Sequence, residues 1–244
     1  MKDIQKDRDL KKTEYLLLHG YGESPEVWGN VEGLLKGYQI RPTNLIELFN
    51  DPDASRSFEE MASTILKRLT EEGNGSTTII ANSMGGYLAL ELLRQNPEQF
   101  KKLVLIATHP FADSMVKIRE RNREIELIGK GKAVLLGQAF THPHREPVKS
   151  NLFAIWQKWS DKALVNALRA MQSRSSQEAT MRKCKIPIHF IVGEKDEAID
   201  GKQLEAVIAQ APNATLHKMI GQDHWLLHHW QPQFREALAL CLES

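Results

Sequence analysis

Cysteine is scarce in this sequence, and long apolar runs are missing. The two cysteines, Cys184 and Cys241, have neither the spacing of a metal site nor the pattern of a disulfide framework, so the chain predicts a reduced, cytoplasmic setting. No apolar run reaches the length of a membrane-spanning helix, and no membrane partner is expected. Residues 1–12 are highly charged and lack an apolar centre, so we do not expect them to be a secretory signal.

An excess of either charge is also missing. The 244 residues have a formal net charge of +1, with basic and acidic residues interspersed, which gives no electrostatic footprint for nucleic acid. The length suits a single α/β domain with a substantial core, and no internal repeat interrupts it. The composition therefore favours an enzyme acting on a small molecule over a protein that binds nucleic acid or a membrane.

The order of apolar patterns along the chain predicts the fold class. Strand-like runs alternate with helical patterns, which is typical of a mostly parallel sheet covered by helices on both faces. We expect an α/β protein with about six strands, at Glu14–Leu18, 38–41, 77–81, 102–107, 186–192 and Ala214–Met219. Helices are expected at 25–35, 58–70 and 87–94 and near the C-terminus, ending about residue 242.

The most informative segment joins the third of these strands to a helix. Residues 82–86 read Asn-Ser-Met-Gly-Gly and place Ser83 at a sharp strand-to-helix turn with strained backbone angles. The residues two before and two after Ser83 must be small, and Ala81 and Gly85 meet that demand. A hydroxyl beside a helix N-terminus suits a nucleophile, because the helix dipole favours a developing negative charge. The alternative is a loop that only connects the two elements.

This segment resembles the nucleophile elbow of the α/β-hydrolase family, with Ala81 in place of the usual first glycine. Residues 19–22, His-Gly-Tyr-Gly, resemble the family's turn after the neighbouring strand. By position in these motifs, the backbone N–H groups of Tyr21 and Met84 form the oxyanion hole. The resemblance implies a structural role for His19 and no place for it among the catalytic residues.

A carboxylate follows the strand at 186–192. Residues 193–196 read Gly-Glu-Lys-Asp, at the carboxyl end of a parallel strand and therefore on the same rim as Ser83. Asp196 matches the acid of the resembled family. Three other carboxylates remain open as alternatives: Glu194, Glu197 and, after the strand that precedes the expected cap, Asp113.

A histidine completes the expected triad. Residues 221–225, Gly-Gln-Asp-His-Trp, place His224 in a loop before the last helix, where it can accept the Ser83 proton. The chain order Ser83, Asp196, His224 is that of α/β-hydrolases. Four other histidines lie in expected strands or on the expected last helix and are not assigned a role: His189, His217, His228 and His229.

Between residues 107 and 186 the alternation gives way to charged helical sequence, at Met115–Gly129, 132–140 and 151–171. The resemblance implies a helical cap over the serine. We therefore expect a core domain of residues 1–107 and 186–244, a cap of residues 108–185, and no N-terminal hairpin before the first strand. Four aromatic residues of the cap are candidates for a pocket, although helical spacing favours packing for the last three: Phe140, Phe153, Trp156 and Trp159.

No metal or cofactor is expected. His142 and His144 have no carboxylate or cysteine partner at a recognised metal spacing. Residues 129–132, Gly-Lys-Gly-Lys, lack the spacing of a phosphate-binding loop. The alternating charges of residues 119–124 are typical of a solvated helix face.

The expected reaction is hydrolysis of a small to medium carboxylic ester through an acyl-enzyme, with Ser83 as nucleophile, His224 as base and Asp196 orienting the imidazole. One alternative is a lyase or carbon–carbon bond hydrolase on the same triad, which requires basic cap residues directed at the serine, the candidates being Arg119, Arg123 and Arg174. Another is a ligand-binding receptor with a nearly idle triad.

Overall fold

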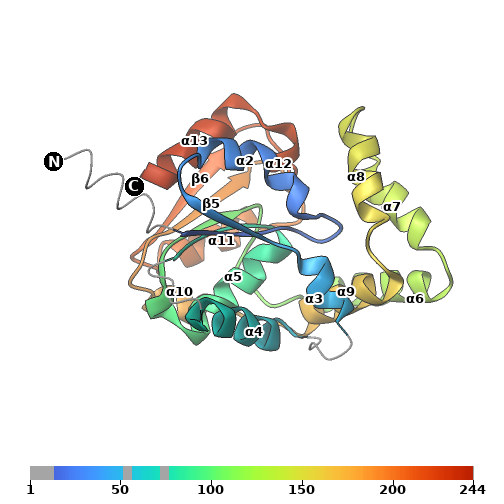
Figure 1. Cartoon of the computed structure of the whole chain (residues 1–244), viewed down its shortest axis with the longest axis horizontal. Helices are drawn as coiled ribbons and strands as arrows, with labels where there is room; N and C mark the ends of the chain where they lie inside the picture. Colours follow the sequence, from blue (N-terminus) through green and yellow to red (C-terminus); the bar gives the residue numbers. More distant parts are fainter. Residues whose placement is uncertain (1–13, 52–56, 72–76, 244) are drawn as a thin grey trace.

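The computed structural model describes residues 14–51, 57–71 and 77–243 (Figure 1). Six strands form one sheet in the order β2-β1-β3-β4-β5-β6, and every neighbouring pair is parallel. The predicted number of strands is therefore confirmed, whereas the predicted absence of an N-terminal hairpin falls outside the described residues. The strands are β1 (Glu14–Leu18), β2 (Gln39–Thr43), β3 (Thr77–Asn82), β4 (Phe100–Ile106), β5 (Ile188–Gly193) and β6 (Ala214–Met219).

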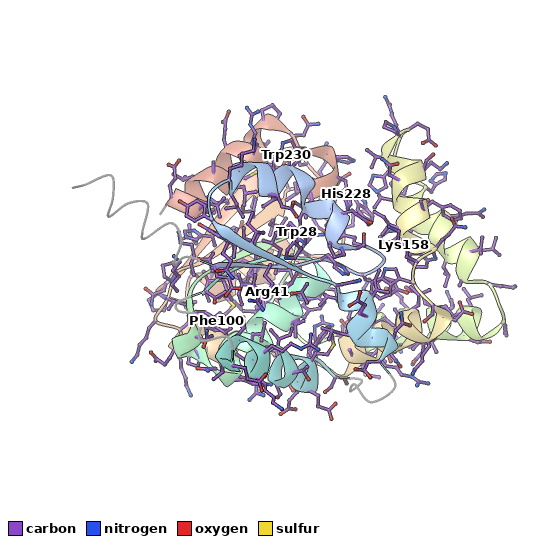
Figure 2. The ribbon with its side chains drawn as sticks, in the orientation of Figure 1. Trp28, Arg41, Phe100, Lys158, His228 and Trp230 are labelled. Atoms are coloured by element: carbon purple, nitrogen blue, oxygen red, sulfur yellow. The ribbon has the colours of Figure 1, made fainter. Side chains whose placement is uncertain are left out.

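Helices cover both faces of the sheet. Successive residues of a strand point to opposite faces, and the inner strands carry apolar residues at both sets of positions, so both faces have to be buried. Leu17 and Ile80 pack on one face with Trp28, which is fully buried (Figure 2). Leu16 and Ile79 pack in the cluster on the other face. In Figure 1 the first face carries α2 (Gly29–Leu34), α12 (Leu226–His229) and α13 (Pro232–Glu243), and the second carries α4 (Phe58–Glu71), α5 (Met84–Gln95) and α10 (Glu178–Lys183).

Between β4 and β5 the chain forms further helices, of which α7 (Ala133–Thr141) and α8 (Val148–Trp156) stand beside the sheet as a pair in Figure 1. The predicted helix at 151–171 is wrong as a single element. Ser160 interrupts it, because its side chain accepts a hydrogen bond from Ala163 N at 3.1 Å and caps a new helix. The other helices of this segment are α6 (Met115–Gly129), α9 (Asp161–Ser173) and α10, which packs on the second face of the sheet.

The C-terminal helix is also divided. Trp230 takes a left-handed φ of 45°, which ends α12, and Pro232 begins α13. His228 and His229 therefore lie on a short separate helix, and the expectation that they belong to the last helix is wrong. The expected helix at 25–35 is likewise split, into η1 (Pro25–Trp28) and α2.

Short elements complete the described chain: α3 (Leu45–Asn50), η2 (Pro97–Gln99) and α11 (Gly201–Ile208). Among the described residues, every helix is too short or too polar to span a bilayer.

Candidate active site

Ser83 lies at the turn between β3 and α5. Its backbone has φ 47° and ψ −114°, a conformation that a residue with a side chain rarely adopts. Two backbone hydrogen bonds hold the turn, from Ser83 N to Ile106 O at 2.8 Å and from Gly86 N to Ser83 O at 2.9 Å. The strained strand-to-helix turn predicted from the sequence is therefore present.

Gly85 allows this turn to pack against the neighbouring strand. A Cβ atom at Gly85 would lie 2.2 Å from the carbonyl oxygen of Leu18, a backbone atom that cannot rotate away. The requirement for a small residue two positions after the serine thus has a specific cause, the close passage of α5 over the end of β1.

Replacing Gly85 with alanine is expected to destabilise the fold by at least about 1–3 kcal/mol, because the backbones of α5 and β1 must separate. Thermal unfolding of the purified variant measures the effect. Gly33→Ala is the matched control, since a Cβ there meets nothing within 4 Å. Because Gly33 lies inside α2, its replacement is expected to raise stability by roughly 0.5–1 kcal/mol. A Gly85→Ala variant as stable as the wild type would contradict this account of the turn.

His224 connects the serine to a buried carboxylate. Its Nε2 lies 3.0 Å from Ser83 Oγ, and its Nδ1 lies 2.7 Å from Asp196 Oδ2. The second oxygen of Asp196 accepts a hydrogen bond from Ala198 N at 2.9 Å, which fixes the carboxylate. Because a carboxylate oxygen only accepts, Nδ1 donates to Asp196, and Nε2 of the neutral ring accepts from the serine hydroxyl. The three residues singled out in the sequence are brought together in hydrogen-bonding order.

The loops that carry the acid and the histidine are joined by backbone contacts. Lys195 N donates to Gln222 O at 2.8 Å, and Gly221 N donates to the Glu194 carboxylate at 2.9 Å. A Cβ at Gly193 would lie 2.3 Å from Asp223 O, so glycine is needed where the loops meet. Glu194 therefore binds the backbone of the histidine loop and does not contact the imidazole in the described structure.

Asp113, the other alternative acid, is committed to two arginines. Its oxygens lie 2.5 Å from Arg121 Nε and 2.6 Å from Arg174 Nη1, and its side chain is 2% exposed. Burial raises the pKa of Asp113, but the hydrogen bonds and charges of Arg121 and Arg174 outweigh it and lower the pKa overall. Among the described residues, the carboxylate that contacts His224 is Asp196 and not Asp113.

The two predicted oxyanion donors are the backbone N–H groups of Met84 and Tyr21. Met84 is the first residue of α5, so its N–H has no carbonyl partner within the helix. Tyr21 follows β1 in the loop that lines the same cavity as Ser83. His19 is fully buried, with Nδ1 2.9 Å from Gly20 O, and Nε2 accepts from Leu45 N at 3.0 Å. This confirms that His19 is a structural residue that holds the loop.

Glu23 connects the parts of the site and was missed by the sequence analysis. Its carboxylate accepts hydrogen bonds from Gly20 N at 2.6 Å and from Asn82 Nδ2 at 3.0 Å, and it lies 2.7 Å from His228 Nε2. The carboxylate thus ties the Tyr21 loop, the residue before Ser83 and helix α12 together; Figure 2 labels His228 on that helix. A glutamate in a loop has no sequence signal that distinguishes this role from a solvated one.

Glu23 is also expected to make stability depend on pH. Burial raises its pKa, but the hydrogen bond and charge of His228 and the hydrogen bonds from Asn82 and Gly20 outweigh it and lower the pKa from 4.5 to about 2. Because the folded-state pKa lies below the unfolded value, this stabilisation is fully present above about pH 4.5 and is lost as pH falls toward 2.

Glu23→Gln is therefore expected to unfold at a lower temperature at neutral pH, and its Tm should change less between pH 4.5 and 2 than that of the wild type. Thermal unfolding followed by circular dichroism across this range tests the prediction. Glu236→Gln, on the exposed side of α13, is the control and should keep the wild-type profile. Parallel profiles for wild type and Glu23→Gln would contradict it.

A cavity of about 510 Å³ opens over Ser83 and His224, within the size range of small-molecule sites. Its lining combines apolar side chains with a charged end. The apolar side chains include Ala107, Phe111, Val116, Phe140, Met171, Ile199 and Trp225, and the charged ones near α6 are Asp113, Lys117, Glu120 and Arg121. Glu197 lines the cavity but is exposed and does not replace Asp196.

The cap aromatics divide between lining and packing. Phe140 lines the cavity. Trp156 and Trp159 are 3% and 5% exposed and belong to the core cluster, which confirms the packing expected from their spacing. Phe153 is half-buried and is not part of the cavity lining.

The charged segment 119–124 differs in part from its predicted solvated face. Arg119 and Arg123 are exposed as expected, but Arg121 is 8% exposed because it pairs with Asp113. Arg174 also pairs with Asp113 and lies 3.8 Å over the Tyr87 ring. None of the three arginines named for a lyase lines the cavity above Ser83; the arginine that does is Arg121.

Comparisons with known proteins agree with this fold. A family model described as "Alpha/beta hydrolase family" matches residues 15–237. A pimeloyl-(acyl-carrier protein) methyl ester esterase from Aromatoleum aromaticum is 29% identical over 102 residues, which span 41% of this chain and 39% of that protein. The curated relatives that the chain matches are covered over 38% to 61% of their own lengths.

Solved structures share the fold at low sequence identity. An esterase from Exiguobacterium antarcticum has a TM-score of 0.83 at 18% identity, with 96% of this chain and 93% of that chain covered. A thermophilic esterase from Thermogutta terrifontis has a TM-score of 0.80 at 17% identity, with 96% and 89% covered. Because the family model matches most of the sequence and these structures share its fold, the chain belongs to the α/β-hydrolase family.

Proposed function

We propose that this protein is a serine hydrolase that cleaves small to medium carboxylic esters through an acyl-enzyme. The observation that carries the proposal is the pair of contacts made by His224, at 3.0 Å to Ser83 Oγ and 2.7 Å to Asp196 Oδ2. The names of the relatives support it, because the Aromatoleum protein and the two solved structures are all described as esterases.

In the proposed mechanism, His224 Nε2 takes the Ser83 proton as Oγ attacks the ester carbonyl carbon. The carbonyl oxygen becomes an oxyanion held by the N–H groups of Tyr21 and Met84, and losing one such donor typically costs about 2.7–4 kcal/mol of transition-state stabilisation. His224 then protonates the leaving alcohol. A water, deprotonated by the same nitrogen, hydrolyses the acyl-enzyme and restores Ser83, while Asp196 holds the tautomer and stabilises the imidazolium.

The cavity lining supports an acyl group that is partly apolar. Phe111, Phe140 and Met171 offer apolar contact near the serine, and the cavity volume of about 510 Å³ is that of a small-molecule site. Because α6 and α7 supply part of this lining, we further propose that residues 108–185 act as a cap that sets substrate choice. The lyase alternative has less support, since Arg119 and Arg123 are exposed and Arg174 pairs with Asp113. The two basic cap residues that do line the cavity, Lys117 and Arg121, are paired with Glu120 and Asp113.

Hydrolysis of p-nitrophenyl esters from acetate to laurate tests the proposal. We expect turnover that peaks at one acyl length, together with stoichiometric labelling by a fluorophosphonate whose adduct maps to the peptide containing Ser83. A folded protein that neither turns over any ester of the series nor takes up the label would contradict the hydrolase proposal. Slow turnover combined with a ligand-dependent change in the cap would instead favour the receptor alternative.

A further inference from the structure

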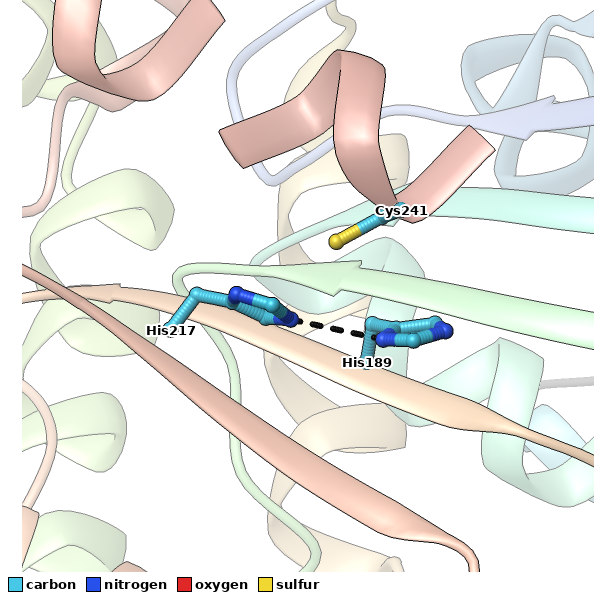
Figure 3. A group of neighbouring side chains, drawn as sticks. All are labelled: His189, His217 and Cys241. Carbon is cyan, nitrogen blue, oxygen red and sulfur yellow. Dashed lines mark hydrogen bonds between the residues drawn. The ribbon is translucent and has the colours of Figure 1, made fainter. Parts of the chain in front are cut away.

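Three side chains that bind metals meet on the sheet face covered by α13. In the register of β5 and β6, His189 pairs with Thr215 and His217 with Ile191, so the two histidines lie on the same face, two residues apart. Cys241 reaches that face from α13 and is fully buried (Figure 3). The figure shows its sulfur directed toward the two imidazoles.

The distances are those of a metal site. His189 Nδ1 lies 3.3 Å from His217 Nε2, and the ligand atoms of all three residues lie within 4.8 Å of one another. A tetrahedral ion with metal–nitrogen bonds of about 2.0–2.1 Å places two nitrogens roughly 3.3 Å apart. The observed separation of the two imidazole nitrogens is close to that value, but the contact is a hydrogen bond. An ion can therefore bind only after the shared proton moves to the far nitrogen of its own ring, both lone pairs turn toward the ion, and the sulfur comes within bonding distance.

The donor set selects the class of ion. Two imidazole nitrogens and one thiolate suit zinc, which is borderline-soft and often bound by three protein ligands with water in the fourth position. His217 is half-buried, and we expect a water molecule to supply the fourth ligand. We propose that His189, His217 and Cys241 form a Zn²⁺ site that fastens α13 to strands β5 and β6.

Lys102 is a positively charged side chain close to the proposed zinc site. Its Nζ donates hydrogen bonds to the carbonyl oxygens of Cys241 and Leu242, at 2.8 and 3.3 Å, and so anchors the last turn of α13. When Zn²⁺ binds, the Zn–S bond forms, the S–H bond breaks and the proton leaves to solvent. The resulting thiolate offsets part of the repulsion between Lys102 and the divalent ion.

The site is structural, because its residues are not among those lining the cavity that contains Ser83. Two ligands lie on neighbouring strands and the third on the last helix, so the complete donor set exists only in the folded chain. Zinc binding is therefore expected to stabilise the folded state by mass action, in proportion to its free concentration relative to the dissociation constant.

The test uses the untagged full chain and two metal ions. We expect about one zinc per chain by elemental analysis after equilibration and dialysis, and a Tm that rises with Zn²⁺ concentration. Substitution with Co²⁺ should give tetrahedral ligand-field bands in the visible range and a thiolate-to-cobalt charge-transfer band in the near ultraviolet.

Variants assign the ligands. Cys241→Ala should lose the charge-transfer band and the stoichiometric zinc, and His217→Gln, on the half-exposed edge strand, should lose the zinc-dependent rise in Tm. Cys184→Ala is the matched control, because it removes the other buried cysteine, whose Sγ donates to Ile186 O. His229→Ala removes a half-exposed histidine of α12. Both controls should keep the wild-type response.

Three results would overturn the proposal. The first is a wild-type chain with no stoichiometric zinc and no change in Tm. The second is a cobalt spectrum without the thiolate band. The third is equal zinc retention by the wild type and a folded Cys241→Ala variant. None of these readouts depends on esterase activity.

Discussion

Ser83→Ala is expected to abolish ester hydrolysis, with kcat/KM reduced by about 10⁴–10⁶-fold. The substitution removes Oγ, the atom that becomes acylated in the proposed mechanism. The oxyanion donors and the cavity are still present and can still bind the ester. A hydroxyl facing a half-exposed imidazole contributes little to folding, so Tm should stay close to the wild-type value. Progress curves with the preferred p-nitrophenyl ester, at matched concentrations of folded protein, measure the loss.

The control for this substitution is another serine. Ser63→Ala lies on the exposed side of α4, where the hydroxyl bonds to Glu59 O, and it should retain full activity. Turnover that survives in Ser83→Ala would show that the ester is cleaved elsewhere or by a contaminant. That outcome would remove Ser83 from the proposed mechanism, because no other nucleophile in the proposal could take its place.

Asp196→Asn is expected to lower kcat by roughly 10⁴-fold while leaving the fold in place. Asparagine has nearly the same shape, but an amide N–H turned toward His224 cannot accept from Nδ1–H. The imidazole then favours the tautomer that carries its proton on Nε2, and it can no longer accept the serine proton. The substitution also removes the negative charge that stabilises the imidazolium. The pH dependence of kcat, together with Tm, distinguishes this loss from unfolding.

Asp113→Asn separates the two candidate acids. The substitution removes the negative charge of Asp113 and leaves the buried charges of Arg121 and Arg174 uncompensated. Breaking a buried ion pair typically costs about 3–5 kcal/mol of stability. We therefore expect a lower Tm but a kcat per folded molecule much closer to the wild type than that of Asp196→Asn. The reverse ranking of kcat would make Asp113 the acid of the triad and contradict the assignment of Asp196.

Much of the fold was predictable because local patterns and the tertiary structure agree. Strands β1 and β6 begin and end at the predicted residues, since each is a short apolar or alternating run. Helix α6 also has its predicted bounds, and Ser114 caps it through a hydrogen bond from Lys117 N. The helix predictions that failed concern breaks within helical sequence. They lie at Ser160 and Trp230, where one cap or one backbone angle divides an otherwise continuous pattern, and between η1 and α2.

The candidate site was predictable in part. Ser83, Asp196 and His224 follow strands whose carboxyl ends share one rim, so their order in the sequence predicts their meeting. Glu23 was not predictable, because its partners Asn82 and His228 are distant in sequence and no spacing links them. The catalytic roles of the triad, the division into core and cap, and the expected cytoplasmic setting without nucleic-acid, membrane or cofactor partners stay predictions.

The sequence by itself determined the family, the parallel sheet and the residues that form the candidate triad, because these depend on short motifs and on local apolar periodicity. Only the tertiary structure decided which carboxylate faces His224, which arginine lines the cavity, and that His189, His217 and Cys241 meet beneath α13. The physical reason is that strand register and helix packing set these contacts. Both act between segments far apart in the chain, where the spacing of residues carries no information about distance.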